Sequence, residues 1–349
     1  MSWRPPRPCC ALRGRSRRNA LLHIPFRIER LCRPPGGHRV GASANLTAAN
    51  GRAALRLKKR NAVKLLIGYL ATPGGADALT LGVRLARTFG AELEICAVLP
   101  VPVPLNTEYQ EELGEQAEQW LREALDCVPD DLAAHTHVSF RESFAEGISQ
   151  EAERLGAAAI VVGGSGGGLA GGFSLGSVVN ELLHSAPVPV AVAPRGIRHS
   201  DVDRIRSVTC AVGMRPGADD LLATAVRISS AAGCPLRLVS LVPLDQYGSR
   251  NEVSAEAVRQ QAVDHAAATL AAARSSLPEG FPVTVVVADG ATVEAAVEKL
   301  DWRDGDLIMV GSSRLAQPRR LFLGSTAAKM LRVLHVPLVV VPSPDAPGR

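Results

Sequence analysis

Aromatic residues are scarce in this chain, at 4% of 349 residues, and no run of about 18 apolar residues occurs in it. The missing apolar run predicts that no segment spans a membrane. Because the hydrophobic fraction is nevertheless 46%, any core must be built from Val, Leu, Ile and Ala, which suits parallel strands buried between helices. The length suffices for two ordinary domains, each with its own core.

Cysteine is also sparse and shows no pattern. Three of the seven cysteines lie within the first 60 residues, and no CxxC pair or metal-ligand spacing occurs. This arrangement argues against a disulfide frame or a zinc motif and favours small buried thiols in a reducing, cytoplasmic compartment. The histidines are scattered singly and predict no metal site either.

Positive charge is unevenly distributed. Residues 1–60 hold 13 Arg, 2 Lys and one acidic residue, Glu29, so the net charge of this segment is +14. Because the net charge of the whole chain is +5, the net charge of the remainder is −9. A mildly acidic folded part makes nucleic acid an unexpected partner. Three interpretations of the basic segment stay open: a disordered arm that touches nucleic acid or membrane, a targeting peptide, or upstream sequence translated from a misassigned start. We favour the last, because the segment has no amphipathic period.

The rest of the chain repeats itself. The segment that begins at Lys64 and turns at Pro73 resembles the one that begins at Val208 and turns at Pro216, and the two prolines are 143 residues apart. Later landmarks repeat at an offset of 148: Gly163 and Gly311, Gly176-Ser177 and Gly324-Ser325, and Pro189 and Pro337. Two constant offsets indicate one insertion between duplicated halves.

Each half alternates apolar runs with amphipathic helical stretches. Strands are predicted at Val63–Tyr69, Leu93–Leu99, Val138–Phe140, Ala158–Val162 and Val188–Ala193, and again at Val208–Val212, Leu236–Val242, Val283–Ala288, Leu307–Val310 and Leu338–Val341. This order predicts an α/β fold of two tandem, doubly wound, five-stranded parallel-sheet domains. The expected divisions are a basic extension over 1–60, a first domain over 61–196, a linker over 197–206, a second domain over 207–343 and a tail over 344–349.

A glycine-rich loop follows the fourth predicted strand of the first half. It runs from Gly163 through Gly166 to Gly176 and Ser177, where a helix to about His184 begins. Glycines let the backbone approach phosphates closely, the helix start offers free N–H groups, and Ser177 offers a hydroxyl. Because ligands of parallel sheets gather beyond the carboxyl ends of the strands, the sequence predicts an anion cradle here.

The spacing of these four loop residues fits G-x2-G-x9-G-S/T and resembles the ATP-binding signature of universal stress proteins. The resemblance covers both halves, from about residue 61 to 342, and implies the Rossmann-like, adenine nucleotide alpha-hydrolase-like fold and an ATP-binding role in stress response. It implies that ATP, with or without Mg, contacts the four loop residues together with Val178 and Val98. It further implies that the fifth strands pair into an internal pseudo-dimer, and it leaves a homodimer open.

The second copy departs from the signature. Gly311, Gly324 and Ser325 fit it, but Arg314 stands where the second glycine would be. Its guanidinium group either pairs with phosphates or fills the pocket, so the sequence leaves open whether this site binds ATP.

The Asp that ATP-binding members usually carry after the first strand is also missing. By register Leu70 and Gly213 occupy its place, while Leu241, like its counterpart in the first half, fits an apolar slot for a base. The alternative function is therefore an interaction protein with degenerate sites, and no base for ATP hydrolysis is identified in the loop. Asp77 and Asp220 stand early in the first helix of each half, where we expect them to cap the helix and complement its dipole.

Overall fold

The computed structural model of this protein describes residues 62–100, 107–164, 176–213, 217–247, 252–312 and 321–342. The predictions for the basic extension over 1–60 and the tail over 344–349 lie outside these residues.

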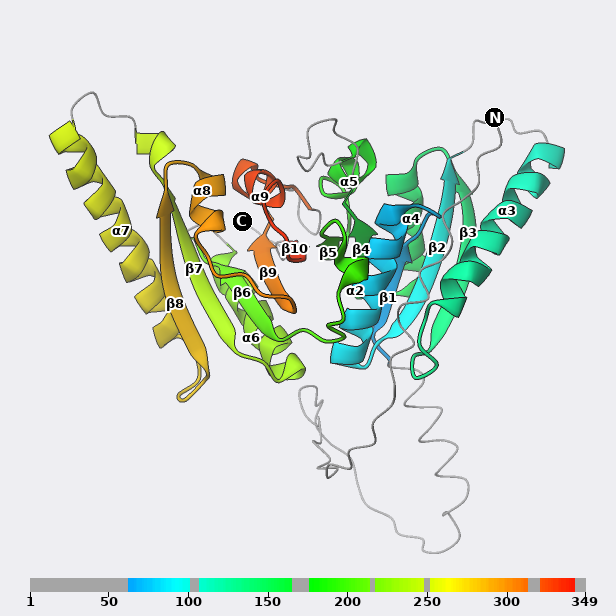
Figure 1. The fold of residues 1–349 in the computed structure, drawn as a ribbon, viewed down its shortest axis with the longest axis horizontal. Coiled ribbons are helices and arrows are strands. Elements are labelled where there is room, and N and C mark those ends of the chain that lie inside the picture. Colours follow the sequence, from blue (N-terminus) through cyan, green and yellow to red (C-terminus); the bar gives the residue numbers. More distant parts are fainter. Residues whose placement is uncertain are drawn as a thin grey trace, which may run out of the picture. The chain divides into compact units, whose positions relative to one another are not determined.

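The strands of the described residues form one ten-stranded sheet in the order β3-β2-β1-β4-β5-β10-β9-β6-β7-β8 (Figure 1). The first half contributes β1 (Lys64–Gly68), β2 (Glu92–Pro100), β3 (Ala134–Arg141), β4 (Ala159–Gly163) and β5 (Val190–Ala193). The second contributes β6 (Ser207–Ala211), β7 (Leu236–Pro243), β8 (Val283–Gly290), β9 (Asp306–Gly311) and β10 (Leu338–Val341). All strand pairs within a half are parallel, which confirms the predicted α/β class.

The helices cover both faces of the sheet, as a doubly wound fold requires. One hydrophobic core includes side chains of α2 (Pro73–Phe89), α3 (Thr107–Asp126), α6 (Ala218–Ala232) and α7 (Glu252–Ser275). The core on the other face includes side chains of α4 (Phe144–Leu155), α5 (Ser177–Leu182), α8 (Val293–Glu298) and α9 (Ser325–Leu331). None of the described helices has the length and apolar character needed to cross a membrane.

The two halves join through their fifth strands. Strands β5 and β10 pair antiparallel, with Ala191 opposite Val339, so the predicted pairing between copies is present within this chain. Because β5 has β4 on its other side and β10 has β9, neither strand has a free edge to offer a second copy of the chain.

Strand β3 begins four residues earlier than the sequence suggested, at Ala134 instead of Val138. It is an edge strand of the sheet, and its residues His135 and Thr136 are exposed. These residues form no apolar run in the sequence, because an edge strand exposed to solvent can pair with its neighbouring strand through few apolar side chains.

The linker between the halves is bound to helix α2. The carboxylate of Asp77, which is 1% exposed, accepts hydrogen bonds from the backbone N–H groups of Gly196 (3.0 Å) and Arg198 (3.1 Å) and from the Arg198 guanidinium (2.8 Å). The prediction that Asp77 caps the helix is wrong, since Thr72 is the N-cap and accepts from the N–H of Gly75 at 3.2 Å. Asp77 instead satisfies donors of the 3-10 turn η2 (Ile197–His199).

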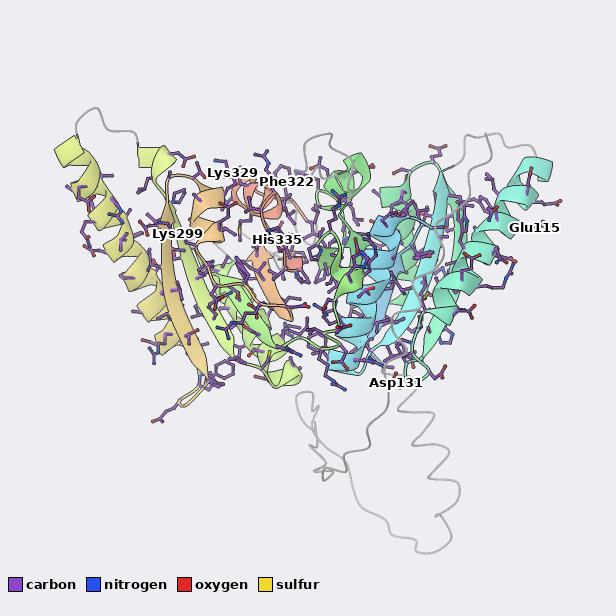
Figure 2. All side chains as sticks on the ribbon, viewed as in Figure 1. Glu115, Asp131, Lys299, Phe322, Lys329 and His335 are labelled. Atoms are coloured by element: carbon purple, nitrogen blue, oxygen red, sulfur yellow. The ribbon has the colours of Figure 1, made fainter. Side chains whose placement is uncertain are left out.

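A buried arginine of α2 bridges the linker and the second half. Arg84 is 1% exposed; its guanidinium donates to the Val202 carbonyl (2.9 Å) and the Ser200 hydroxyl (2.6 Å) and pairs with Asp304 (3.1 Å). Burial lowers the pKa of Arg84, although the nearby Asp304 opposes this shift. A second ion pair of α2, between Arg87 and Asp131, lies on the surface; Asp131 is labelled in Figure 2.

A buried carboxylate lies near the amino end of β2. Glu94 is 2% exposed and accepts from Lys64 Nζ at 2.8 Å and from His137 Nε2 at 2.7 Å. Burial acts to raise the pKa of Glu94, but the hydrogen bonds and charges of His137 and Lys64 outweigh it, so the pKa is lowered overall.

Candidate functional site

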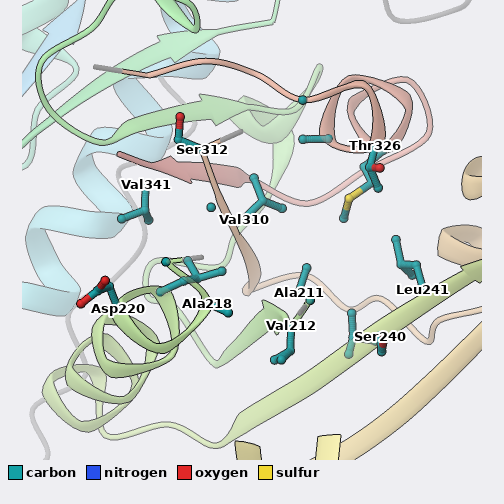
Figure 3. A pocket seen from close by; sticks show the side chains of 18 of the residues that line it. Ala211, Val212, Ala218, Asp220, Ser240, Leu241, Val310, Ser312, Thr326 and Val341 are labelled. Carbon is teal, nitrogen blue, oxygen red and sulfur yellow. The ribbon is translucent and has the colours of Figure 1, made fainter. Parts of the chain in front are cut away.

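A cavity of about 280 Å³ lies in the second half, beyond the carboxyl ends of β6, β7 and β9 (Figure 3). Strand β6 pairs with β7 on one side and with β9 on the other. After β6 the chain adds β7 and β8 on one side of it and then β9 and β10 on the other side. The strand order therefore reverses at β6, which is the switch point of this doubly wound sheet. Ligands of open α/β sheets bind in the crevice at such points.

Glycines keep the cavity open. Gly213, Gly217, Gly311 and Gly324 all line it. Among the residues that the structure describes, a Cβ atom on Gly213 would meet nothing within 4 Å, and one on Gly311 would meet Leu221 Cδ2 at 3.6 Å. None of the described side chains therefore fills the space beside the ends of β6 and β9.

The walls of the cavity differ in chemistry. Leu241 of β7 and Met330 of α9 provide apolar surface, and hydroxyl groups come from Ser240, Ser312 and Thr326. Figure 3 shows Leu241, Ser312 and Thr326 coming from different elements around the space. The lining also includes Asp220, in the predicted place in the first turn of α6. Such a mixture of apolar surface with a few polar groups is typical of small-molecule sites.

The corresponding place in the first half is covered by backbone. Helix α2 begins at Pro73, whereas α6 begins at Ala218, whose counterpart by the 143-residue offset is Gly75. The two additional helical residues bring Gly74 against the end of β4, so closely that a Cβ atom on Gly163 would stand 1.9 Å from the Gly74 carbonyl oxygen. At the equivalent strand end of the second half, the nearest described atom to a Cβ on Gly311 is Leu221 Cδ2 at 3.6 Å, which is an ordinary contact.

The apolar residues predicted to face a base have different positions in the two halves. Val98 has no exposed surface and packs in the core with Phe144 and Ile148. It therefore offers a base no contact in this conformation. Its counterpart Leu241 lines the cavity.

The signature residues of the first half are described only in part. Gly166 lies outside the described residues. Gly163 ends β4, Gly176 immediately precedes α5, and Ser177 and Val178 begin that helix. The role of these residues in phosphate binding stays a prediction.

In the second half the structure brings part of the signature to the cavity. Gly311 and Gly324 line it, and Ser325 begins α9 and is exposed, while the neighbouring Thr326 lines the space. Arg314 lies outside the described residues.

Sequence reasoning missed the turn after β6 as a wall of the site. In the sequence, Gly213 stands out only as the place of a missing Asp, and Gly217 carries no signal beyond following Pro216 in the repeated turn. The signal was present in the two Pro-Gly turns: Gly75 follows the first, whereas Ala218 and Asp219 follow the second. Comparing the two halves of the sequence does not reveal how these different residues shift the first residue of each helix.

The repeated parallel sheet, with a cavity at one switch point, defines a Rossmann-like α/β protein. The model of the universal stress protein family matches residues 63–194 and, a second time, residues 204–342. The chain therefore belongs to the universal stress protein family and carries two family domains in tandem.

Known proteins resemble the chain over both domains. Universal stress proteins of Mycobacterium tuberculosis and Mycobacterium bovis are 28% identical over 299 residues, which is 80% of this chain and 99% of theirs. The solved structure of a universal stress protein from Archaeoglobus fulgidus, 20% identical, covers 81% of this chain and 97% of its own with a TM-score of 0.53. Another from that organism, solved in complex with dAMP, is 18% identical and covers 38% of this chain and 97% of its own with a TM-score of 0.30.

Proposed function

We propose that this protein is a nucleotide-binding stress-response module and that the cavity of the second half binds ATP. The observation that carries the proposal is the glycine-lined opening at the β6/β9 switch point, where Gly213 and Gly311 leave room for a ligand. Membership of the universal stress protein family supports the same function.

The size and walls of the cavity suit one end of a nucleotide. A volume of about 280 Å³ lies just below the range of about 300–1,000 Å³ that is usual for ligand pockets. It matches the nucleoside portion of ATP, with the base against Leu241 and the ribose near the hydroxyls. The phosphates then extend past Gly311 and Gly324. For Arg314, both predictions from the sequence stand: it pairs with the phosphates or it fills the pocket.

A Mg ion would be held mainly by the phosphates. Among the described residues that line the cavity, Asp220 is the carboxylate available to it. Magnesium in nucleotide sites commonly uses one or two carboxylates, water and phosphate oxygens. The described residues therefore fit a Mg–ATP complex and do not form a cage for the ion alone.

The first half is a weaker candidate than its glycine-rich sequence suggested. The carbonyl of Gly74 covers the strand end at Gly163, where the second half is open. We therefore assign the principal site to the second half, and keep the first-half loop as a predicted second site.

Calorimetric titration of Mg-ATP into the full chain tests the proposal. Gly213→Leu should fill the cavity and weaken binding at least about tenfold, since its side chain has room to point into the site. Gly114→Leu, a change of the same size on α3, is the matched control and should bind like wild type, because its Cβ makes only an ordinary contact with Phe140 at 3.6 Å.

Two outcomes decide between the halves and between functions. If Gly166→Val removes binding and Gly213→Leu does not, the nucleotide occupies the first half and our assignment is wrong. If the wild-type chain takes up no ATP at millimolar concentration, the interaction protein with degenerate sites is the better description.

A further inference from the structure

Two backbone hydrogen bonds cross between the halves beside the cavity. The N–H of Leu321 donates to the carbonyl of Ala186, and the N–H of Leu323 donates to that of Leu183, both at 3.0 Å. The two leucines are 1% and 5% exposed and pack in a hydrophobic core shared with α5. The segment that leads into α9 of the second half is therefore anchored on the first half.

A ring contact lies between these two hydrogen bonds. His184 meets Phe322, which is labelled in Figure 2, edge to face, with ring centroids 4.7 Å apart and an interplanar angle of 84°. The imidazole is itself fixed, because its Nδ1 lies 2.6 Å from the Asn180 carbonyl, which can only accept a hydrogen bond. A fixed ring of the first half thus holds the middle residue of the segment.

The same segment is bonded to the wall of the cavity. The Ser312 hydroxyl accepts from the N–H of Phe322 at 2.8 Å, and the N–H of Ser312 donates to Val341 at 2.8 Å. Ser312 lines the cavity, and so does Gly324, which directly follows the segment. Residues 321–323 consequently stand between α5 of the first half and the cavity of the second.

We propose that His184, with the carbonyls of Leu183 and Ala186, positions the nucleotide site of the other half. This inference rests on the proposed function of that cavity. The residues do not line the cavity, but they set the place of Ser312 and Gly324, which do. The first half thereby completes the site of the second, and affinity there depends on a side chain across the domain boundary.

The coupling is reciprocal by thermodynamic necessity. A nucleotide that stabilises the positioned form of residues 321–324 also stabilises the end of α5. Helix α5 starts at Ser177, in the predicted signature loop of the first half. The two signature segments are therefore linked through one short helix.

Two measurements on the full chain test this role. The first is hydrogen exchange of the Leu321 and Leu323 amides without nucleotide, and the second is the affinity for Mg-ATP. In His184→Ala we expect faster exchange of both amides and affinity reduced about threefold to tenfold, the range expected for one lost aromatic pair. His184→Phe keeps an aromatic ring against Phe322 but cannot donate to the Asn180 carbonyl. It should recover most of the lost protection and affinity; if it instead behaves like His184→Ala, the ring contact does not hold the segment.

His265→Ala is the matched control, because His265 is exposed on α7 of the second half. It should leave exchange and affinity unchanged. If wild type binds ATP and His184→Ala shows wild-type exchange and affinity, the positioning role is refuted while the proposed function stands. If wild type binds no ATP, the proposed function fails, and the exchange rates alone decide whether His184 holds the segment.

Discussion

Replacing Arg84 by Met should destabilise the protein mainly through its lost linker contacts. Arg84 is 1% exposed and donates to Val202 and Ser200, while its ionic partner Asp304 is 50% exposed at the side chain. Methionine preserves most of the apolar stem, so the change removes the guanidinium with little loss of packing.

The expected magnitude follows from those contacts. Hydrogen bonds that involve a charged group contribute about 1.5–3 kcal/mol each. In the variant, water can partly replace the two N–H groups of Arg84 as hydrogen-bond donors, because the acceptor residues Ser200 and Val202 are only half-buried. The ion pair adds less than about 1 kcal/mol, since solvent screens Asp304. We therefore expect Arg84→Met to lower the free energy of unfolding by about 2–4 kcal/mol.

Equilibrium unfolding in urea, followed by circular dichroism, measures this loss. Asp304→Asn is the comparison and should cost less than about 1 kcal/mol. A double-mutant cycle should accordingly give a small coupling energy. The reasoning is refuted if Asp304→Asn destabilises as much as Arg84→Met, because the energy would then reside in the ion pair and not in the linker contacts.

Two further predictions concern the other end of the first half and the asymmetry of the strand ends. Glu94→Gln should make the free energy of unfolding depend less on pH in the acid range. The pKa of Glu94 is lowered in the folded state, so its carboxylate contributes stability that is complete above the unfolded pKa of about 4.3. That stability is lost as pH falls through the folded pKa, and glutamine has no such titration. Unfolding free energies measured between neutral and acid pH check this, and an unchanged pH dependence would contradict it. Gly163→Ala should cost about 2–3 kcal/mol, because its Cβ would stand 1.9 Å from a backbone oxygen, while Gly311→Ala, with a nearest contact of 3.6 Å, should cost less than about 1 kcal/mol. Equal losses in thermal unfolding would show that both strand ends are packed alike.

The sequence by itself determined the duplication, the class of fold and the approximate place of all ten strands. Strands such as β4 and β5 are buried on both faces, so their apolar runs are visible without a structure. The glycine signature could likewise be located, because it depends on residue types at short, fixed spacings. These features are local, and local patterns survive in a linear sequence.

Only the tertiary structure decided which strand end stays open and what Asp77 binds. Asp77 and Asp220 occupy equivalent places in the repeat, yet Asp77 holds the linker and Asp220 lines a cavity. The difference arises because the partners of Asp77 lie about 120 residues away in the chain. The closed end at Gly163 likewise depends on where one helix begins relative to a strand almost 90 residues later. Contacts of this kind are set by the packing of distant segments, and no spacing within either repeat encodes them visibly.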